Sequence, residues 1–363
     1  MSTLRQISKH TDLAVSTVSE VLRGLPGYNE ATRTKVLQAA EQLNYQPNHL
    51  ARGLRQKRSG VIGLVFNSLN SVPITLAKFA TIERLVRAKG YGVLIANHYD
   101  RPDPELGAIQ QLLRSQVEGM VLFSQKNNNQ KHIEKFLADG VKIVTIDSPF
   151  DIPIADVSVD RVLGAQLQVR HILGDCKRRR IAFVCRPPDS RRTSSVTAKL
   201  QGYEKGLAEF GQTMDDHLFI PHPYQEGHPY EHALNAAAQL LKHRGEYDAV
   251  ILYSDMPALP IVSSFINAGV RIPDEVAIIG FDDLPYVAYL PVPLSTIRQP
   301  RDIGEHVVRR LMEMLEADKI TDEMKRQEWH APTLIVRQST MSDASNTNPF
   351  VQVNQTPASP KEK

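Results

Sequence analysis

A short stretch near the N-terminus carries side chains suited to hydrogen bonding with nucleic acid. The segment Leu13–Gly24 reads LAVSTVSEVLRG and has the length and apolar spacing of one short helix. Its polar side has hydroxyls and one acid, where an ordinary solvated helix has Lys/Glu pairs; these residues are Ser16, Thr17, Ser19 and Glu20. Hydroxyls and small polar tips can reach base edges and phosphates. The pattern favours a helix that reads a DNA groove, and a plain amphipathic surface helix is the alternative.

Residues 1–47 have the pattern expected of a helix-turn-helix domain. Apolar residues recur at helical spacing in three segments, 4–11, 15–22 and one that begins after Asn29. Thr3 and Asn29 are suitable N-cap residues for the first and third segments. Asp12 stands where a tight turn would fall, and aspartate tolerates such a turn. The second helix of a helix-turn-helix enters the major groove.

The side chains of the second helix divide by what they would contact. Val15, Ser16 and Glu20 would point at bases. Thr17 and Ser19 would meet phosphates or pack against the domain.

The charge distribution also indicates an anionic partner for the head. The 363-residue chain has a net charge of +3. Residues 1–60 hold nine Lys or Arg and four Asp or Glu, so the head carries +5 and the rest of the chain −2. A small basic head on a near-neutral body suits a protein that holds an anionic polymer with one end. Chance asymmetry is the alternative.

Four motifs of the head lie in register with those of a known family. They are TVS at 17–19, ATRTKV at 31–36, LNYQPN at 43–48 and ARGL at 51–54. The head resembles the N-terminal signature of the lactose/galactose-repressor family (LacI/GalR type) of bacterial transcription regulators. The resemblance implies a sequence-specific DNA-binding regulator, expected to be a repressor, that answers to a small effector such as a sugar or sugar derivative. It also implies a homodimer on a palindromic operator in double-stranded DNA.

In that family a hinge helix follows the head, orders on operator DNA and enters the minor groove. The segment Asn48–Gln56 matches it, within a hinge that we place at 48–58. Leu54 stands at the position whose leucine wedges into the central base step, and Arg52 and Arg55 flank it. An apolar wedge unstacks a base step and bends the duplex, and the added contact surface offsets that cost. A packed core leucine is the alternative.

Glu20 departs from the family pattern, where many members carry Arg or His. A carboxylate can accept from cytosine N4 but cannot donate to guanine, so the operator should differ from those of Arg-bearing relatives. Alternatively, Glu20 pairs with Arg5 or Arg23 and reads nothing. The residues that we expect to bind DNA are Thr3, Val15, Ser16, Thr17, Ser19, Glu20, Arg23, Asn29, Thr32, Asn48, Arg52, Leu54 and Arg55.

Residues 59–340 alternate between strand-like apolar runs and amphipathic helical segments. Such runs indicate parallel sheets buried on both faces, and there are too many of them for one small lobe. We therefore expect an α/β fold: the helix-turn-helix head followed by two doubly wound parallel-sheet lobes. The resemblance implies that these lobes are similar to periplasmic binding proteins. It also implies that residues 59–340 bind the effector and form the dimer. It places the crossings between lobes near Val159–Arg161, Leu290–Pro293 and Arg326–Glu328.

Ligands of such folds bind at the carboxyl ends of the strands, in the cleft between lobes. Carboxylates and amides follow several strands and suit a polyhydroxylated ligand. The GFDD motif at 280–283 matches the family's effector-contacting Asp, and Lys199 replaces an Arg at the start of KLQGY. A loop cap, a solvated lysine and simple apolar packing are the respective alternatives for Asp282, Lys199 and Ile74. The residues that we expect to bind effector are Ile74, Thr75, Asp147, Lys199, Ser254, Asp255 and Asp282.

Other classes of protein fit less well. A sugar-binding transport component would leave the head idle, and an enzyme would need a catalytic motif that we do not find. His222, His228 and His232 lack a defensible metal spacing, so we expect a surface loop there and no metal or cofactor. Two cysteines and no apolar leader favour the cytoplasm and its nucleoid, with no membrane partner. We expect residues 341–363 to be a disordered tail.

Overall fold

The structure is a computed structural model that describes two units of the chain. It covers residues 3–22, 24–45, 59–66, 73–98, 102–124, 127–186, 194–222 and 229–341. Contacts divide the chain into the units Met1–Gly60 and Val61–Lys363, and each is described by itself. Within the ranges given, no helix is long and apolar enough to cross a membrane. The expected hinge at 48–58 and all but the first residue of the expected tail lie outside the described residues.

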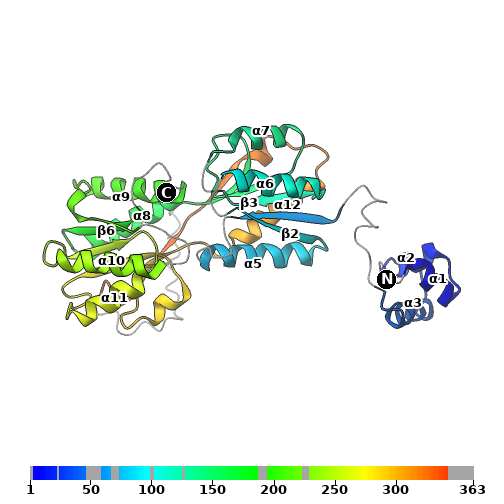
Figure 1. The fold of residues 1–363 in the computed structure, drawn as a ribbon, viewed down its shortest axis with the longest axis horizontal. Helices are drawn as coiled ribbons and strands as arrows, with labels where there is room; N and C mark the ends of the chain where they lie inside the picture. Colours follow the sequence, from blue (N-terminus) through cyan, green and yellow to red (C-terminus); the bar gives the residue numbers. More distant parts are fainter. Residues whose placement is uncertain are drawn as a thin grey trace, which may run out of the picture. The chain divides into compact units, whose positions relative to one another are not determined.

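The first unit is a bundle of three helices, α1 (Leu4–Thr11), α2 (Val15–Leu22) and α3 (Glu30–Gln42) (Figure 1). The three helices bury a small apolar core, which consists of Ile7, Val18, Val21, Val36, Ala39 and Ala40. Each fully buried Val or Ile contributes roughly 1.5–3 kcal/mol to holding the three helices together.

The helices of the head have the N-caps and the turn that the sequence predicted. The backbone N–H of Gln6 donates to Oγ1 of Thr3, and the Gln6 side chain accepts from Thr3 N in return, which completes a capping box. Asp12 ends α1 in the left-handed conformation, with φ of 54°. Oδ1 of Asn29 accepts from the backbone of Thr32 at 2.8 Å and caps α3.

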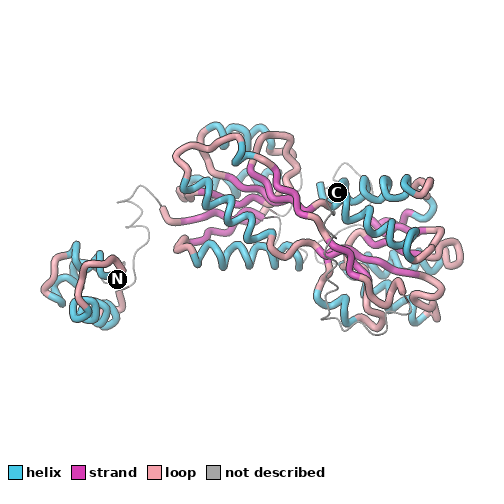
Figure 2. The backbone as a smooth tube through the Cα atoms, turned by 180° about the vertical axis from the view of Figure 1, so that it is seen from behind, coloured by secondary structure: helices cyan, strands magenta, loops and turns pink. Residues whose placement is uncertain are grey.

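The second unit contains two six-stranded sheets. The first has the order β11-β5-β4-β3-β1-β2 and the second the order β12-β10-β9-β8-β6-β7. Their pairs are parallel except β10 with β12. The first sheet consists of β1 (Val61–Phe66), β2 (Gly92–Asn97), β3 (Gly119–Leu122), β4 (Ile143–Ile146), β5 (Ala155–Val159) and β11 (Gln327–His330). The second consists of β6 (Ile181–Cys185), β7 (Phe219–Pro221), β8 (Ala249–Leu252), β9 (Ala277–Asp282), β10 (Ser295–Arg298) and β12 (Thr333–Ile335). The expected pair of doubly wound lobes is confirmed (Figure 2).

Helices cover both faces of each sheet and bury the apolar strands between them. On the first sheet these helices are α5 (Pro73–Ala88) and α12 (Ile303–Glu316) on one face, and α6 (Pro102–Arg114) and α7 (Gln130–Ala138) on the other. On the second they are α10 (Pro229–Lys242) and α11 (Ala258–Asn267) on one face, and α8 (Arg161–Val169) and α9 (Ser194–Glu209) on the other. Short turns complete the list: η1 (Arg170–Asp175), η2 (Asp216–Leu218), η3 (Pro285–Tyr289) and η4 (Glu323–Lys325).

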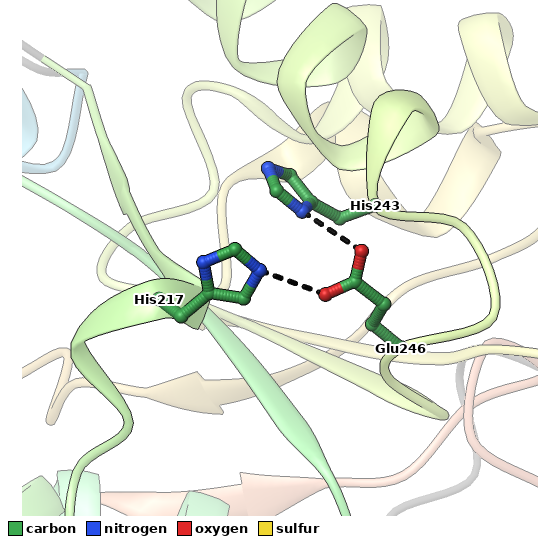
Figure 3. A group of neighbouring side chains, drawn as sticks. All are labelled: His217, His243 and Glu246. Atoms are coloured by element: carbon green, nitrogen blue, oxygen red, sulfur yellow. Dashed lines mark hydrogen bonds and ion pairs between the residues drawn. The ribbon is translucent and has the colours of Figure 1, made fainter.

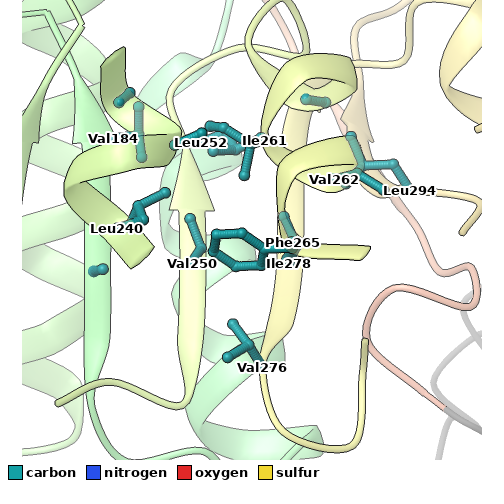
Figure 4. Close-up of a cluster of buried hydrophobic side chains, with 14 of the residues drawn as sticks. Val184, Leu240, Val250, Leu252, Ile261, Val262, Phe265, Val276, Ile278 and Leu294 are labelled. Carbon is teal, nitrogen blue, oxygen red and sulfur yellow. The ribbon is translucent and has the colours of Figure 1, made fainter. Parts of the chain in front are cut away.

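The core of the second lobe is close-packed. Figure 4 shows Phe265 of α11 among the strand residues, together with Val250 of β8 and Ile278 of β9, and all three are fully buried. On the opposite face, α8 and α9 approach so closely that a Cβ built on Gly202 would lie 2.2 Å from the backbone oxygen of Val162. Only glycine fits at that contact.

The chain crosses between the lobes three times. The first crossing lies between β5 of the first sheet and α8, which packs on the second, as expected near Val159–Arg161. The second was expected at Leu290–Pro293 but lies at 299–302, because β10 still belongs to the second sheet. The third was expected at Arg326–Glu328 but lies at 331–332, because the preceding residues form β11 beside β5. These two expectations were wrong because β10, β11 and β12 are short and carry polar residues, and were not recognised as strands.

Candidate DNA-binding head and effector site

Helix α2 presents the side chains expected to read DNA. Ser16 is exposed, while Val15, Thr17, Ser19 and Glu20 are half-buried on the helix surface. Val18 and Val21 point into the core and fix the rotation of the helix. Because the inward face is set by these two valines, the hydroxyl-rich face is directed outward.

Glu20 has a partner that the sequence did not predict. The Oη–H of Tyr28, in the link between α2 and α3, donates a hydrogen bond to Oε2 of Glu20. The alternative drawn from the sequence was an ion pair with Arg5 or Arg23, of which Arg23 lies outside the described residues. A tyrosine that holds one carboxylate oxygen restricts the rotamers of Glu20.

Three further residues of the expected DNA-binding set lie at helix N-termini. Thr3 caps α1, Asn29 caps α3, and the backbone N–H of Thr32 donates to the Asn29 side chain. Helix N-termini attract phosphates, so these positions are consistent with backbone contacts. The expected hinge residues lie outside the described part of the chain; they are Asn48, Arg52, Leu54 and Arg55.

In the second unit, five of the seven residues expected to bind effector are buried. They are Asp147, Lys199, Ser254, Asp255 and Asp282. Ile74 and Thr75, at the start of α5, are half-buried. Ile74 packs against the apolar cluster of the second lobe, which agrees with the alternative of simple apolar packing. This packing is also compatible with a position near a ligand.

Asp147 directly follows β4 and forms a buried ion pair. Oδ2 accepts from Nη2 of Arg161 at 2.8 Å, Oδ1 from Nη1 of the same guanidinium, and Nζ of Lys78 lies 3.7 Å from Oδ2. The backbone N–H of Val159 donates to Oδ1 at 2.9 Å. Burial alone would raise the pKa of Asp147, but Arg161 and Lys78 outweigh it and hold the pKa below the usual range of an aspartate.

Asp282 ends β9 and connects to both lobes. Nε2 of Gln299 donates to its Oδ1 at 2.6 Å, and Oε1 of Gln299 accepts from Nζ of Lys78 at 2.9 Å. Asp147 and Asp282 both have positive φ, of 54° and 116°. Such backbone conformations are unfavourable for residues other than glycine and cluster at ligand sites.

Lys199 of α9 is buried, with 5% of its surface exposed, so the solvated-lysine alternative is wrong. Its Nζ donates to the carbonyl oxygen of Tyr253 at 2.7 Å and lies 3.8 Å from Oδ1 of Asp282. The ammonium also lies 3.8 Å from the centre of the Phe281 ring. Burial lowers the pKa of Lys199 to about 8, and Asp282 limits that decrease. The Lys199 ammonium therefore loses its proton more readily than that of an exposed lysine, and it lies beside an aspartate.

Asp255 and Ser254 have structural partners. The Asp255 carboxylate accepts from the backbone of Leu284 at 2.9 Å and from Oγ1 of Thr296 at 2.8 Å. It holds the loop after β9 against β10, and burial raises its pKa well above that of a free aspartate, with Asp282 adding to the rise. Oγ of Ser254 accepts from the backbone of Met256 at 3.4 Å. The backbone N–H of Asp255 also donates to the carbonyl oxygen of Phe281, the residue before Asp282, at 2.8 Å.

The comparisons with known proteins agree with the head and the lobes. The model of bacterial regulatory proteins of the lacI family matches residues 3–48, and that of the periplasmic binding protein-like domain matches residues 172–340. The HTH-type transcriptional regulator GalR of Escherichia coli (strain K12) is 30% identical over 303 residues, which is 83% of this chain and 85% of GalR. The chain belongs to the lactose/galactose-repressor family. It is a DNA-binding transcription regulator, as the signature of the head predicted.

Other members of the lactose/galactose-repressor family match along nearly the whole chain. The ribose operon repressor of Haemophilus influenzae is 28% identical over 344 residues, which is 94% of this chain and 99% of the repressor. The catabolite control protein A of Priestia megaterium is 27% identical over 323 residues, covering 88% of this chain and 94% of its own. The structure of the lac repressor dimer bound to operator and an anti-inducer aligns with a TM-score of 0.78 at 23% identity, over 94% of this chain and 99% of that one.

Three residues of the buried network in this family member were missed by the sequence analysis. Lys78 lies on the buried side of α5, Arg161 follows β5, and Gln299 follows β10. Had β5 and β10 been recognised as strands, Arg161 and Gln299 would have been found as polar residues at strand ends. For Lys78 the signal was a lysine on the apolar face of an amphipathic helix.

The loop that carries His222, His228 and His232 lies only partly within the described residues. Of its histidines, His222 is buried beside Tyr253 and His228 lies outside the described residues. Among the described residues, the groups that could hold a metal are two others, His217/His243/Glu246 and Asp302/His306/His330.

Proposed function

We propose that this regulator is a homodimeric repressor whose affinity for a palindromic operator is set by a small effector bound between its two lobes. The observation that carries the proposal is the buried network in which Lys78 of the first lobe meets Gln299 and Asp282 of the second. Polar groups from two lobes that meet at the carboxyl ends of parallel strands are where ligands of doubly wound folds bind.

Different parts of the chain have different roles in this proposal. We assign residues 1–47 to the head, 48–58 to a hinge helix, and 59–340 to effector binding and dimerisation. Val15, Ser16 and Glu20 read bases in the major groove. Leu54 enters the minor groove as a wedge. Two heads on a two-fold dimer require a two-fold operator, as in the operator complex of the lac repressor dimer.

We assign the effector to sugars or sugar derivatives, and among these we favour one that carries an acidic group. Solved relatives include a complex of the regulator CelR with cellobiose, which aligns with a TM-score of 0.66. Three buried cations, Lys78, Arg161 and Lys199, face the carboxylates of Asp147 and Asp282. Burial raises the pKa of two further carboxyl groups near these cations, Asp156 and Asp255, which reduces their negative charge. An anionic group would balance the extra positive charge, and the carboxylates suit hydroxyls.

The proposed mechanism couples the two sites through the lobes. An effector that contacts Lys78, Lys199 and Asp282 replaces part of their mutual network, so the arrangement of the lobes shifts. The hinge helices order only when held together on DNA, so a small shift changes DNA affinity. The regulator acts at the nucleoid in the cytoplasm.

Fluorescence anisotropy with the DNA upstream of the protein's own gene tests the proposal. The titration is run at several salt concentrations, with and without a panel of neutral sugars, sugar acids and phosphorylated sugars. We expect a specific complex whose affinity falls with salt, is lost in Leu54→Ala and changes with one ligand class. Equal affinity for random DNA would contradict the operator assignment. Unchanged affinity with every ligand of the panel would contradict the effector assignment.

A further inference from the structure

A second group of titratable side chains lies in the second lobe at the amino ends of β7 and β8, whereas the buried network lies at carboxyl ends of strands. His217 belongs to η2, His243 follows the last residue of α10, and Glu246 lies in the turn before β8. Nε2 of His217 lies 2.8 Å from Oε2 of Glu246, and Nδ1 of His243 lies 3.1 Å from Oε1 (Figure 3). One ligand atom from each residue lies within 4.8 Å of the other two.

We propose that His217, His243 and Glu246 form a surface site for a divalent transition-metal ion, with Zn²⁺ as the best match. Zn²⁺ takes imidazole nitrogen and carboxylate oxygen at about 2.0–2.2 Å, in a tetrahedral arrangement that puts neighbouring ligand atoms roughly 3.3 Å apart. The nitrogens of His217 and His243 lie 2.8 and 3.1 Å from the two oxygens of Glu246, a little short of that value. Small shifts of the side chains would open room for the ion.

The donor set selects the class of metal. Two imidazoles and one carboxylate suit Zn²⁺, Co²⁺, Ni²⁺ and Cu²⁺, whereas Ca²⁺ and Mg²⁺ prefer oxygen ligands alone. Three protein ligands leave a fourth position for water. His217 and Glu246 are 63% and 47% exposed in their side chains, so the ion and its water can enter directly from solvent.

Charge at the site favours a cation. Glu246 supplies the negative group of the site, and each of its two oxygens faces one imidazole nitrogen. Arg244, which follows His243 in the sequence, is directed elsewhere: its Nε and Nη2 donate to Glu275 at 2.7 and 3.0 Å, and Nη1 to the carbonyl oxygen of Ala268. A divalent ion would replace the ring protons that now bridge to Glu246.

The backbone already holds the three ligands in place. The N–H of Glu246 donates to the carbonyl oxygen of His243 at 3.0 Å, and the N–H of His217 donates to the Asp215 side chain at 3.0 Å. Metal binding would therefore join η2, the end of α10 and the turn before β8 without a large change in any of them. The consequence is a stabilised second lobe.

The group formed by Asp302, His306 and His330 provides a contrast within the same chain. Its neighbour Glu328 contacts both histidines but also Arg309 at 2.7 Å and Arg310 at 3.4 Å. Two guanidinium groups beside the ligands oppose a divalent cation. This second group supplies the matched control.

The test uses the full-length protein after removal of any affinity tag and of bound metal with a chelator. Co²⁺ is titrated as an optical probe, and Zn²⁺ binding is measured by calorimetry and by the melting temperature. We expect one equivalent of Co²⁺ with visible absorption, and a higher melting temperature with Zn²⁺. Because metal binding releases protons from its ligands, affinity should fall as the solution is made acidic.

Variants locate the ion. His217→Ala, His243→Ala and Glu246→Gln should each weaken Zn²⁺ binding by more than about tenfold. His306→Ala should leave it unchanged. Melting temperatures without metal show that each variant is folded. Undetectable binding of Zn²⁺ and Co²⁺ at millimolar concentration overturns the proposal, as does binding that survives in His243→Ala or is lost in His306→Ala.

Discussion

The Nζ atom of Lys78 lies 2.9 Å from Oε1 of Gln299, a residue 221 positions later in the chain. Lys78 belongs to α5 of the first lobe, and Gln299 opens the segment that crosses from the second lobe to α12. Gln299 also donates to Asp282. One glutamine side chain thus connects a buried cation of one lobe to a buried carboxylate of the other.

Replacement of Gln299 by alanine should destabilise the second unit. The change leaves Lys78 and Asp282 without these hydrogen bonds in a buried setting, and we expect a loss of about 2–3 kcal/mol in the free energy of unfolding. Urea denaturation of the full chain measures it. Gln239→Ala, on the exposed side of α10, is the control and should change stability by less than about 0.5 kcal/mol. Equal stability of the two variants would contradict the role of Gln299.

The pKa of Lys199 predicts how effector affinity varies with pH. The value is about 8, so the side chain is charged below that pH and neutral above it. An anionic effector favours the charged form. Its affinity should therefore be constant from pH 6.5 to 7.5 and decrease above pH 8, whereas that of a neutral sugar should not. Calorimetric titration across this range measures both.

Lys199→Met should remove that pH dependence and weaken an anionic effector by about tenfold or more, since one charge-assisted hydrogen bond is lost. Lys205→Met, at an exposed position of the same helix, is the matched control. A decrease in affinity above pH 8 that persists in Lys199→Met would show that another group titrates.

The contact between Tyr28 and Glu20 predicts effects on operator preference. Tyr28 engages Oε2, and the second carboxylate oxygen can accept from a cytosine amino group. Glu20→Gln should then change the preferred base at one position of each half-site, by about 1–3 kcal/mol. Tyr28→Phe should weaken that preference while the ring still packs on the head. Binding to a library of randomised half-sites measures both.

The exposed Glu41 of α3 provides the control for that experiment. Glu41→Gln should leave the preferred sequence unchanged. If Glu20→Gln also leaves it unchanged, Glu20 has only the structural role of a partner for Tyr28.

Gly202 should not tolerate a side chain. A Cβ there would lie 2.2 Å from the backbone oxygen of Val162, so Gly202→Ala must separate α8 from α9, and we expect a loss of about 3 kcal/mol or more. Gly107 of α6 faces open space, and Gly107→Ala should raise stability by about 0.5–1 kcal/mol. Thermal denaturation of the two variants compares them directly; a destabilised Gly107→Ala would indicate that helix propensity alone does not govern that site.

Asp255 should make stability depend on pH. Its folded pKa lies well above the unfolded value of about 3.9, so the folded protein binds the proton more tightly. This contribution is complete below about pH 4 and is lost as the pH rises through the folded pKa. Asp255→Asn cannot ionise, so its unfolding free energy should fall less with pH. Urea denaturation from pH 4 to 8 tests this, and parallel curves for the variant and the natural protein would contradict it.

The sequence by itself determined the elements whose signals are local. Thr3 and Asn29 cap the helices that their positions predicted, and Asp12 adopts the expected left-handed turn, because capping and turn formation depend on residues three or four positions apart. The apolar runs that became β1 and β9 were recognised because both of their faces are buried. The motifs of the head also determined the family.

Some elements were accessible to sequence reasoning but were not found. Helix α12 has a regular apolar stripe, with Val307, Leu311 and Leu315 buried, and its spacing alone could have predicted it. By contrast, β11 reads QEWH and has no strand signal of its own. It becomes a strand because β5 offers a free edge to pair with.

Only the tertiary structure decided which polar residues meet. The chain's crossings between the two sheets bring five of them together: Lys78, Asp147, Arg161, Asp282 and Gln299. The same holds for Tyr28 with Glu20, and for His217 with Glu246. Periodicity reports which face of an element is buried. It carries no information on which distant side chain lies opposite, because that depends on the packing of whole elements.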